Sequence, residues 1–351
     1  MKLAIITDTH FGARNDNLNF NEYFYKFYDN IFFPTLKERG ITTCIHMGDV
    51  TDRRKYISYR IANDFRERFV NRFKEMGIDL HITIGNHDTY YKNTSEINSM
   101  HELVGSDNFK IYTGPEVVEF DGTPILFIPW INSNNYEISM EALETANADV
   151  CMGHLEVNGF DMYKGQPAEG KYEKKLFRRF DTVFSGHFHH KSDDGQIYYL
   201  GTPYELFWND YQDPKGFHIF DTSTRELERI VNPHTLFEKI YYNDVDNNYQ
   251  EHDVSKYKEK YVKLIVVNKK DLYQFDMFVD RLLKADAYEV KIIEDFSELD
   301  AKNVSDDIVE NTEDTMTLLE KYIDDLDVTL DKKRLKNTMK SLYNEAQDLE
   351  L

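Results

Sequence analysis

Five short polar clusters occur in the first two-thirds of the chain, and their residue types are those that bind divalent metal ions. In chain order they are Asp8-Thr9-His10, Gly48-Asp49-Val50-Thr51-Asp52, Gly85-Asn86-His87-Asp88, Gly153-His154 and Gly186-His187-Phe188-His189. One such cluster is weak evidence, because a Gly-Asp pair is usually only a turn. If each cluster were only a turn, five clusters rich in His, Asp and Asn would have to occur together by coincidence. They predict one dinuclear metal site assembled from five loops.

The donor atoms in these clusters indicate the chemistry. Two divalent ions about 3.5 to 4 Å apart can activate a water molecule and neutralise both the attacking and the leaving oxygen of a phosphoester displacement. The clusters offer carboxylates, imidazoles and an amide oxygen but no thiolate, a set that suits manganese or iron better than a structural zinc. Asp49 opens the central cluster, so we expect its carboxylate to bridge the two ions.

Each cluster follows a short apolar run that can position it. These runs cover residues 3–6, 44–47, 81–84, 150–152 and 182–184. Short runs of apolar and β-branched residues bounded by glycine and polar residues are typical of buried strands. Loops at the carboxyl ends of strands in an α/β sheet converge on one crevice. The five clusters are therefore expected to meet in space.

Helical patterns lie between the strands. Aromatic and aliphatic residues recur at three- and four-residue spacing at positions 20, 24, 27, 28 and 31 and again at 61, 65, 69 and 73. The alternation of strand and helix predicts an α/β layered domain over residues 1–235. The two aromatic stripes are expected to lie in its core.

Two further units follow in the sequence. Strand-like runs at 261–267 and 288–293 flank a helical pattern at 272–283, which predicts a small β-α-β domain over residues 241–296. The last unit, residues 297–351, begins with an acidic linker and continues with two short amphipathic helices around 318–326 and 335–343. Such helices can simply pack back onto their own domain, so their role is left open by the residues alone.

The charge distribution is uneven. The net charge of −21 argues at first against a nucleic-acid partner. However, residues 294–351 hold 17 acidic and 7 basic residues, so about half of the excess lies in this tail. Basic residues occur in two places near the polar clusters: Arg53, Arg54 and Lys55, and then Lys174, Lys175, Arg178 and Arg179. A basic run is most often a solvated face, and contact with a phosphate backbone is the alternative.

Other features bear on the compartment. The only cysteines, Cys44 and Cys151, lie in apolar strand-like runs, which fits two buried thiols in a reducing environment. No apolar run approaches the roughly 18 residues of a membrane span. The amino terminus shows no signal-peptide pattern. We expect a cytoplasmic protein without a membrane partner.

The pattern D-x-H, G-D-x-x-D, G-N-H-D, G-H and G-H-x-H resembles the calcineurin-like metallophosphoesterase superfamily over residues 1 to about 205. Within it, residues 8–12 and 186–189, followed by Tyr199-Leu200-Gly201-Thr202-Pro203, are similar to the SbcD-type nuclease subunits of double-strand-break repair complexes, including those of tailed phages. The resemblance implies a layered sandwich, two divalent ions and DNA cleavage by exonuclease and single-strand endonuclease activity. Manganese is the expected metal, with magnesium or iron as alternatives. For a phage-encoded chain the compartment would be the host cytoplasm.

The resemblance also implies individual roles. Asp8, His10, Asp49 and His189 would hold one ion, and Asp49, Asn86, His154 and His187 would hold the other. His87 would contact the scissile phosphate or protonate the leaving oxygen, and Asp88 would orient His87. Some relatives have His at the position of Asp52, with a role in exonuclease action. Because this chain continues with Arg53-Arg54-Lys55 where relatives tend to have Pro and small residues, its mode of cleavage stays open.

Partners are implied in the same way. In relatives a small capping domain shapes DNA access, and the C-terminal helices dock on the coiled-coil base of an SMC-like ABC-type ATPase. The chain has no G-x-x-x-x-G-K-[ST] phosphate loop, so an ATP-driven step would need that partner. Helices near the second and third clusters form a homodimer interface in relatives, and for this chain dimerisation is left open.

Two other functions compete with the nuclease. The first is a small-substrate phosphoesterase of the same superfamily, such as a protein phosphatase or a cyclic-nucleotide phosphodiesterase. Residues 48–53 do match a phosphatase motif, but phosphatases usually carry Gly-Asn-His-Glu, whereas Asp88 follows His87 here. The second is a non-catalytic scaffold for the ATPase, which is disfavoured because a competent residue fills every expected ligand position.

Overall fold

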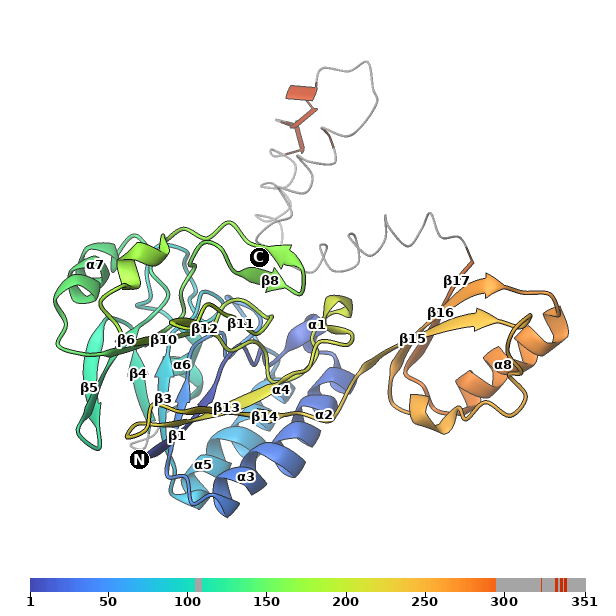
Figure 1. Cartoon of the computed structure of the whole chain (residues 1–351), viewed down its shortest axis with the longest axis horizontal. Coiled ribbons are helices and arrows are strands. Elements are labelled where there is room, and N and C mark those ends of the chain that lie inside the picture. Colours follow the sequence, from blue (N-terminus) through green and yellow to red (C-terminus); the bar gives the residue numbers. More distant parts are fainter. Residues whose placement is uncertain (105–108, 295–322, 324–331, 334, 337, 340–351) are drawn as a thin grey trace.

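The computed structural model describes residues 1–104, 109–294, 323, 332–333, 335–336 and 338–339. Two six-stranded sheets form the main body, helices lie on their outer faces, and a smaller three-stranded unit follows (Figure 1). This arrangement confirms the predicted α/β layered class.

The first sheet has the strand order β14-β13-β1-β2-β3-β4. Strands β1 to β4 are mutually parallel, β13 pairs antiparallel with β1, and β14 pairs antiparallel with β13. Their bounds are Lys2–Ile6 for β1, Thr43–His46 for β2, Asp79–Thr83 for β3, Phe109–Tyr112 for β4, Gly216–Asp221 for β13 and Leu227–Val231 for β14. Because parallel strands end at one edge of the sheet, the three clusters after β1, β2 and β3 emerge together.

The second sheet has the order β11-β12-β10-β7-β6-β5, with β6, β7, β10 and β12 parallel. Its strands are Glu116–Phe120 (β5), Thr123–Ile128 (β6), Val150–Gly153 (β7), Thr182–Ser185 (β10), Ser192–Asp193 (β11) and Ile197–Tyr199 (β12). The fourth and fifth clusters follow β7 and β10. A separate two-stranded pair, Asp161–Tyr163 (β8) and Gln166–Pro167 (β9), lies after the fourth cluster.

Alternate residues of the strands fill two different cores. Leu3 and Ile5 of β1 pack with Val150 and Met152 of β7 between the two sheets. The intervening Ala4 and its neighbours pack against the helices on the outer face. Strands buried on both faces read as continuous apolar runs, which explains why they were recognisable in the sequence.

The aromatic stripes form the outer core of the first sheet. Its helices are Leu18–Phe27 (α2), Phe33–Glu38 (α3), Tyr59–Phe65 (α4) and Asn71–Met76 (α5), and π-helical turns at Tyr28–Phe32 and Arg66–Val70 connect them in pairs. The rings of Phe65 and Phe69 stack with their centres 5.4 Å apart, and both side chains are fully buried. Three further helices precede the small unit, Ala13–Asp16 (α1), Ser99–Leu103 (α6) and Tyr136–Thr145 (α7), and 3-10 turns occur at Lys174–Phe177, Trp208–Asp210 and Ser255–Tyr257. Leu143 of α7 packs on the second sheet.

The small unit is a three-stranded parallel sheet with one helix and a core of its own. It contains β15 (Phe237–Asn243), β16 (Tyr261–Asn268), α8 (Leu272–Lys284) and β17 (Glu289–Ile293). The β-α-β expectation missed β15, which begins before residue 241. Its sequence, FEKIYYN, places two charged residues after the first aromatic and so lacks a clear strand pattern.

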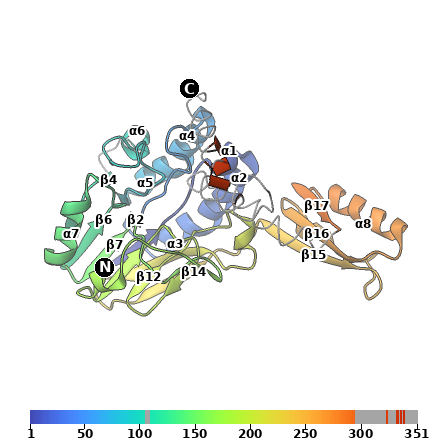
Figure 2. The ribbon, with the colours of Figure 1, turned by 90° about the horizontal axis from the view of Figure 1, so that it is seen from above.

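The small unit lies beside the helical layer of the main body in both views (Figures 1 and 2). The ring of Phe20 in α2 lies 6.0 Å from that of Phe237 and 5.3 Å from that of Tyr261. An ion pair between Lys26 and Glu259 adds a polar contact at this junction. These contacts hold the first residues of β15 and of β16 against α2.

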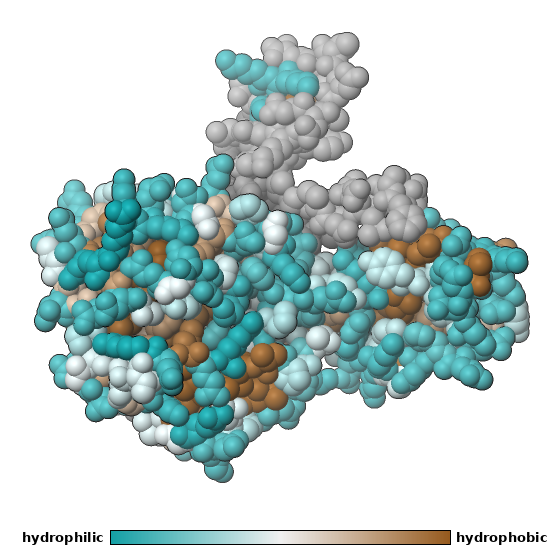
Figure 3. Space-filling view, in the orientation of Figure 1, coloured by the Kyte–Doolittle hydropathy of each residue, from teal (hydrophilic) through white to brown (hydrophobic). Residues whose placement is uncertain are grey.

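The surface in the orientation of Figure 1 is mainly hydrophilic, with apolar residues gathered in smaller areas over both units (Figure 3). Within the described ranges no helix is long and apolar enough to cross a membrane. Cys44 and Cys151 are buried free thiols. Of the two predicted tail helices, one residue of the first (323) and four of the second (335–336 and 338–339) are described, all as helical, and the rest lie outside the described residues.

Candidate metal centre

Backbone hydrogen bonds join the loops that carry the polar clusters. Asp8 N donates to Gly48 O at 3.0 Å, and His10 N donates to Asp49 O at 3.1 Å, which ties the first loop to the second. On the other sheet Gly186 N donates to Gly153 O at 3.0 Å. The clusters thus meet at the carboxyl edge of both sheets.

Two glycines permit this close approach. A Cβ atom at Gly85 would lie 2.2 Å from Asp49 Oδ1. A Cβ atom at Gly186 would lie 2.1 Å from Thr7 Oγ1 and 2.8 Å from Asp8 Oδ2. Any side chain at either position would displace a carboxylate of the site.

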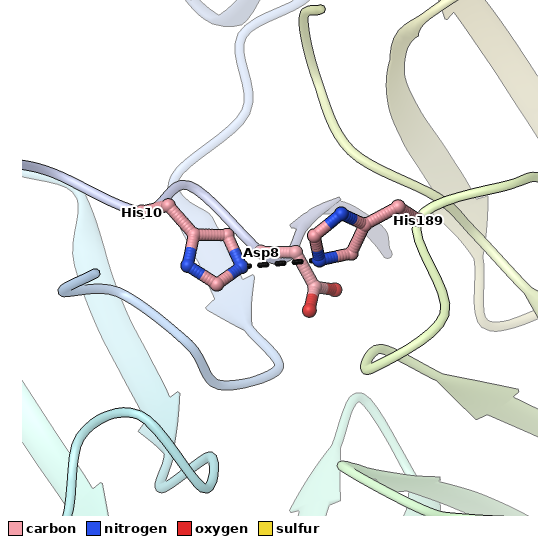
Figure 4. A group of neighbouring side chains, drawn as sticks. All are labelled: Asp8, His10 and His189. Carbon is pink, nitrogen blue, oxygen red and sulfur yellow. Dashed lines mark hydrogen bonds between the residues drawn. The ribbon is translucent and has the colours of Figure 1, made fainter. Parts of the chain in front are cut away.

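The first ligand group consists of Asp8, His10 and His189, which are all buried and whose donor atoms lie within 4.8 Å of one another (Figure 4). His10 Nε2 and His189 Nε2 are 3.2 Å apart and face each other. The Asp8 carboxylate accepts from Thr7 Oγ1 at 2.7 Å and from His187 N at 3.0 Å. These bonds fix the carboxylate beside the two imidazoles.

The second group consists of Asp49, His154 and His187, again with donor atoms within 4.8 Å. Asn86 Oδ1 lies 3.0 Å from His154 Nε2 and 3.0 Å from His187 Nδ1, so the amide oxygen completes this group. His154 Nδ1 lies 2.9 Å from the carbonyl oxygen of Met47 and must donate to it. That bond leaves Nε2 as the nitrogen that can bind a metal.

Asp49 reaches both groups. Its Oδ2 lies 3.9 Å from His10 Nε2 and 3.3 Å from His154 Nε2. Its Oδ1 accepts from His87 N at 2.8 Å, which orients the carboxylate. Asp49 therefore occupies the position expected of a carboxylate that bridges two ions.

Burial and charge shift the pKa values of the imidazoles in opposite directions. Burial alone would lower the pKa of His10, but Asp52, Asp49 and Asp8 outweigh it and raise that pKa to about 9. Burial likewise opposes the protonated form of His154, yet Asp49 and Asp8 raise its pKa to about 10. For His187 burial prevails, and its pKa falls to about 4.

The two acidic ligands also differ. Burial raises the pKa of Asp8 to about 6. Burial would also raise the pKa of Asp49, but His154, His87 and His10 lower it well below its ordinary range. A buried carboxylate that is ionised among imidazoles, with oxygen and nitrogen donors and no thiolate, fits divalent cations such as manganese, magnesium or iron.

Strained backbone occurs at several of the predicted ligands. Four of the seven predicted ligands have left-handed backbone angles although none is glycine: Asp8 with φ 51°, His10 with 44°, Asp49 with 53° and His187 with 83°. Such conformations cost about 1–3 kcal/mol each and persist where the surrounding structure enforces them. The fold therefore holds these donors in place against a local preference.

His87 lies beside the metal groups. Its Nδ1 is 2.5 Å from the backbone carbonyl oxygen of Asp52, so Nδ1 donates and Nε2 is left for another contact. The half-buried ring meets the ring of His10 edge-on, with centres 4.9 Å apart. Asp52 Oδ1 lies 3.4 Å from His10 Nδ1. Asp52 thus supports two histidines, one through its backbone and one through its carboxylate.

Asp88 does not orient His87, and its expected role needs correction. Its Oδ1 accepts from the backbone N–H groups of Val50 at 2.9 Å and Thr51 at 3.0 Å, and its Oδ2 accepts from Gly85 N at 2.9 Å. The carboxylate joins the loops that follow β2 and β3. Neighbours in a tight turn point in different directions, so adjacency in sequence was a poor guide.

The two predicted basic groups lie differently with respect to the centre. Arg53 pairs with Asp16 at 2.5 Å, and Arg54 Nη1 donates to Thr89 Oγ1 at 2.8 Å, both within two residues of Asp52 or Asp88. Lys55 is exposed next to them. In the second group Lys174 pairs with Asp194, and the other three residues are exposed: Lys175, Arg178 and Arg179. Within the described part of the chain, no contact joins this second group to the metal-ligand residues.

Two residues near the centre escaped sequence reasoning. Glu156 Oε1 lies 4.0 Å from His187 Nε2 and accepts from Trp130 Nε1 at 2.9 Å. Lys215 Nζ donates to the backbone carbonyl oxygen of His189 at 2.9 Å. Neither belongs to a recognisable motif. The only feature of the sequence that could have indicated Glu156 is its position two residues after His154.

Comparisons with known proteins agree with this geometry. A family described as "Calcineurin-like phosphoesterase" matches residues 1–191. "Exonuclease subunit 1" of Enterobacteria phage T4 is 35% identical over 315 residues, which cover 88% of this chain and 89% of that protein. A solved structure described as a novel archaeal phosphodiesterase covers 66% of this chain and 100% of its own, with 15% identity and a TM-score of 0.34, and it carries no weight here.

Proposed function

The chain belongs to the calcineurin-like phosphoesterase family, and we propose that it is the metal-dependent DNA nuclease subunit of a recombination and repair complex. The observation that carries this proposal is the position of Asp49 between two groups of buried oxygen and nitrogen donors. The name of the phage T4 relative, an exonuclease subunit, supports DNA as the substrate.

The residues divide between two ions. Asp8, His10, Asp49 and His189 would hold the first ion, and Asp49 would share the second with Asn86, His154 and His187. Divalent ions bound there would activate a water molecule and neutralise charge on the phosphodiester oxygens. Manganese is the proposed metal, with magnesium and iron as alternatives.

His87 supplies the proton chemistry in this proposal. Because its Nδ1 donates to Asp52 O, Nε2 is the nitrogen that can carry a second proton. From there it can contact the scissile phosphate or protonate the leaving oxygen. Asp52 keeps the rings of His10 and His87 in place, and Asp88 keeps the loops in place.

The other parts of the chain receive roles in the same proposal. Residues 1–235 form the nuclease domain, and the unit around 241–296, which begins with β15, caps the approach of DNA. Residues 297–351 dock on an SMC-like coiled-coil ABC-type ATPase in the host cytoplasm. The name of the relative, which is that of a subunit, supports such an assembly. A homodimer is compatible with it.

The test is cleavage of end-labelled single- and double-stranded DNA by the purified chain in the presence of manganese, beside an Asp49→Asn control. We expect cleavage by the natural chain and its loss in the control. A parallel assay with p-nitrophenyl phosphate separates the alternative. Turnover of this small ester without DNA cleavage would contradict the nuclease and favour a small-substrate phosphoesterase.

A further inference from the structure

Two loops next to the metal centre carry basic and aromatic residues on an otherwise acidic chain. One loop follows Asp52, and residues 53–60 contain four basic residues and no acidic one. The other follows Asp88, and residues 89–95 contain one basic residue and no acidic one. Against a net charge of −21, these loops form a local cationic surface.

Tyrosines on both loops are open to solvent. Tyr56 is 63% exposed, Tyr90 38% and Tyr91 50%. The Arg53 guanidinium lies 4.4 Å over the ring of Tyr56, and Lys55 Nζ lies 6.0 Å from the centre of the ring of Tyr90. Each of these two rings therefore has a cation beside it while much of its surface stays accessible.

The loops are held together and are anchored to the site. Arg54 Nη1 donates to Thr89 Oγ1 at 2.8 Å, which joins the two loops. Tyr90 N donates to Ile97 O at 2.9 Å and keeps the second loop folded on itself. At their base, His87 Nδ1 bonds to Asp52 O. The tyrosines thus project from a fixed support beside the proposed catalytic histidine.

We propose that Tyr56, Tyr90 and Tyr91, together with Lys55 and Lys92, form a platform on which unpaired bases of a DNA strand stack next to the metal centre. The proposal rests on the nuclease function and adds the class of strand that is held there. Every base has a π face, so stacking on tyrosine tolerates any sequence, and the neighbouring cations contact the phosphates. Bases within a duplex already stack on each other and gain only the phosphate contacts.

A second copy of the chain is the competing occupant, since exposed tyrosines also suit protein interfaces. In a two-fold symmetric dimer the same patch would face itself. The cationic side chains that the two loops expose would then face the same cations of the second copy: Lys55, Arg60 and Lys92. This repulsion favours a polyanionic strand over a second copy.

The test measures fluorescence anisotropy of a labelled oligothymidine and of a matched duplex, with EDTA present so that no cleavage occurs. The full chain is compared with a Tyr90→Ala/Tyr91→Ala variant. The control is Ile138→Ala, which removes an apolar side chain that is 52% exposed on α7, outside the two loops and outside the capping unit. We expect single-strand affinity to fall roughly tenfold or more in the double variant, with little change on the duplex and none in the control.

Two results would overturn the platform: equal affinities of the double variant and the natural chain for the oligothymidine, or an equal loss on both DNAs. Unchanged DNA binding together with loss of a dimer on gel filtration would assign the surface to a second copy instead. Hydrolysis of bis-p-nitrophenyl phosphate by the double variant verifies that the centre is intact. A natural chain that cleaves no DNA at all would instead refute the underlying nuclease proposal.

Discussion

At the scale of single residues, two imidazoles of the metal centre carry protons that a metal ion must displace. The pKa values of His10 and His154 are raised to about 9 and about 10 by the carboxylates around them, so both imidazoles are protonated at pH 7 before metal binds. Metal ligation requires neutral imidazole. The same carboxylates that attract the cations therefore also make binding depend on pH.

Metal affinity is expected to rise with pH from 6 to 9, and binding at pH 7 is expected to release about two protons per chain. Both signs follow from pKa values raised above the working pH. Calorimetry in buffers of different ionisation enthalpy measures the protons released. Binding without proton release would mean that His10 and His154 are neutral before metal binds.

His87→Ala is expected to lower DNA cleavage by roughly 10²- to 10⁴-fold, because it removes a proton donor while leaving the proposed ligand set complete. Metal content, measured by elemental analysis, should stay close to that of the natural chain. His101→Ala is the matched control, since His101 is exposed and outside the centre. Loss of both ions in His87→Ala would show that His87 is a ligand.

At the scale of elements, the sequence predicted the position of the site well. It did not predict the contacts that hold the loops of the site together. Buried parallel strands have continuous apolar sequences, so the ends of β1, β2, β3, β7 and β10 could be located, and the structure brings the seven predicted ligands together there. The brace formed by Asp88 depends on loops that are distant in sequence. Strand β15 lacked a strand pattern. Such features arise from tertiary contacts that no local motif records.

Lys215 directly precedes β13 and holds the start of this strand against the loop that carries His189. Its ammonium group is buried, donates to His189 O and forms ion pairs with Asp210 at 2.7 Å and Asp213 at 2.8 Å. Truncation would leave two buried carboxylates without their cation. A buried pair broken in this way typically costs about 3–5 kcal/mol.

Lys215→Met is therefore expected to lower the free energy of unfolding by about 3–5 kcal/mol in urea titrations. It should also weaken metal binding at the group that contains His189 more than at the group that contains His154. Lys164→Met serves as the control, because Lys164 is exposed. Stability and metal content equal to the control would show that this cluster does not support the centre.

At the scale of the whole molecule, the nuclease centre lies in the two-sheet body, and the proposed docking segment lies largely outside the described residues. Amphipathic spacing and acidic composition alone indicate helices after a linker in residues 297–351. Whether they bind a partner depends on that partner's surface, which no pattern in this chain encodes. The docking role thus remains a prediction.

Deletion of residues 315–351 is expected to abolish co-elution with the coiled-coil ATPase on gel filtration, because it removes both predicted helices. Basal nuclease activity should persist, since the two sheets and all seven proposed ligands remain. Deletion that leaves the complex intact would rule out this segment as the docking site.

In the proposed centre, Asp49 would bridge two metal ions. Electron paramagnetic resonance of the manganese-loaded chain tests this bridge directly, because two ions that share a ligand about 3.5 to 4 Å apart are magnetically coupled. We expect two manganese ions per chain with a coupled spectrum that Asp49→Asn abolishes. A single uncoupled ion per chain, or a coupled spectrum unaffected by Asp49→Asn, would contradict it.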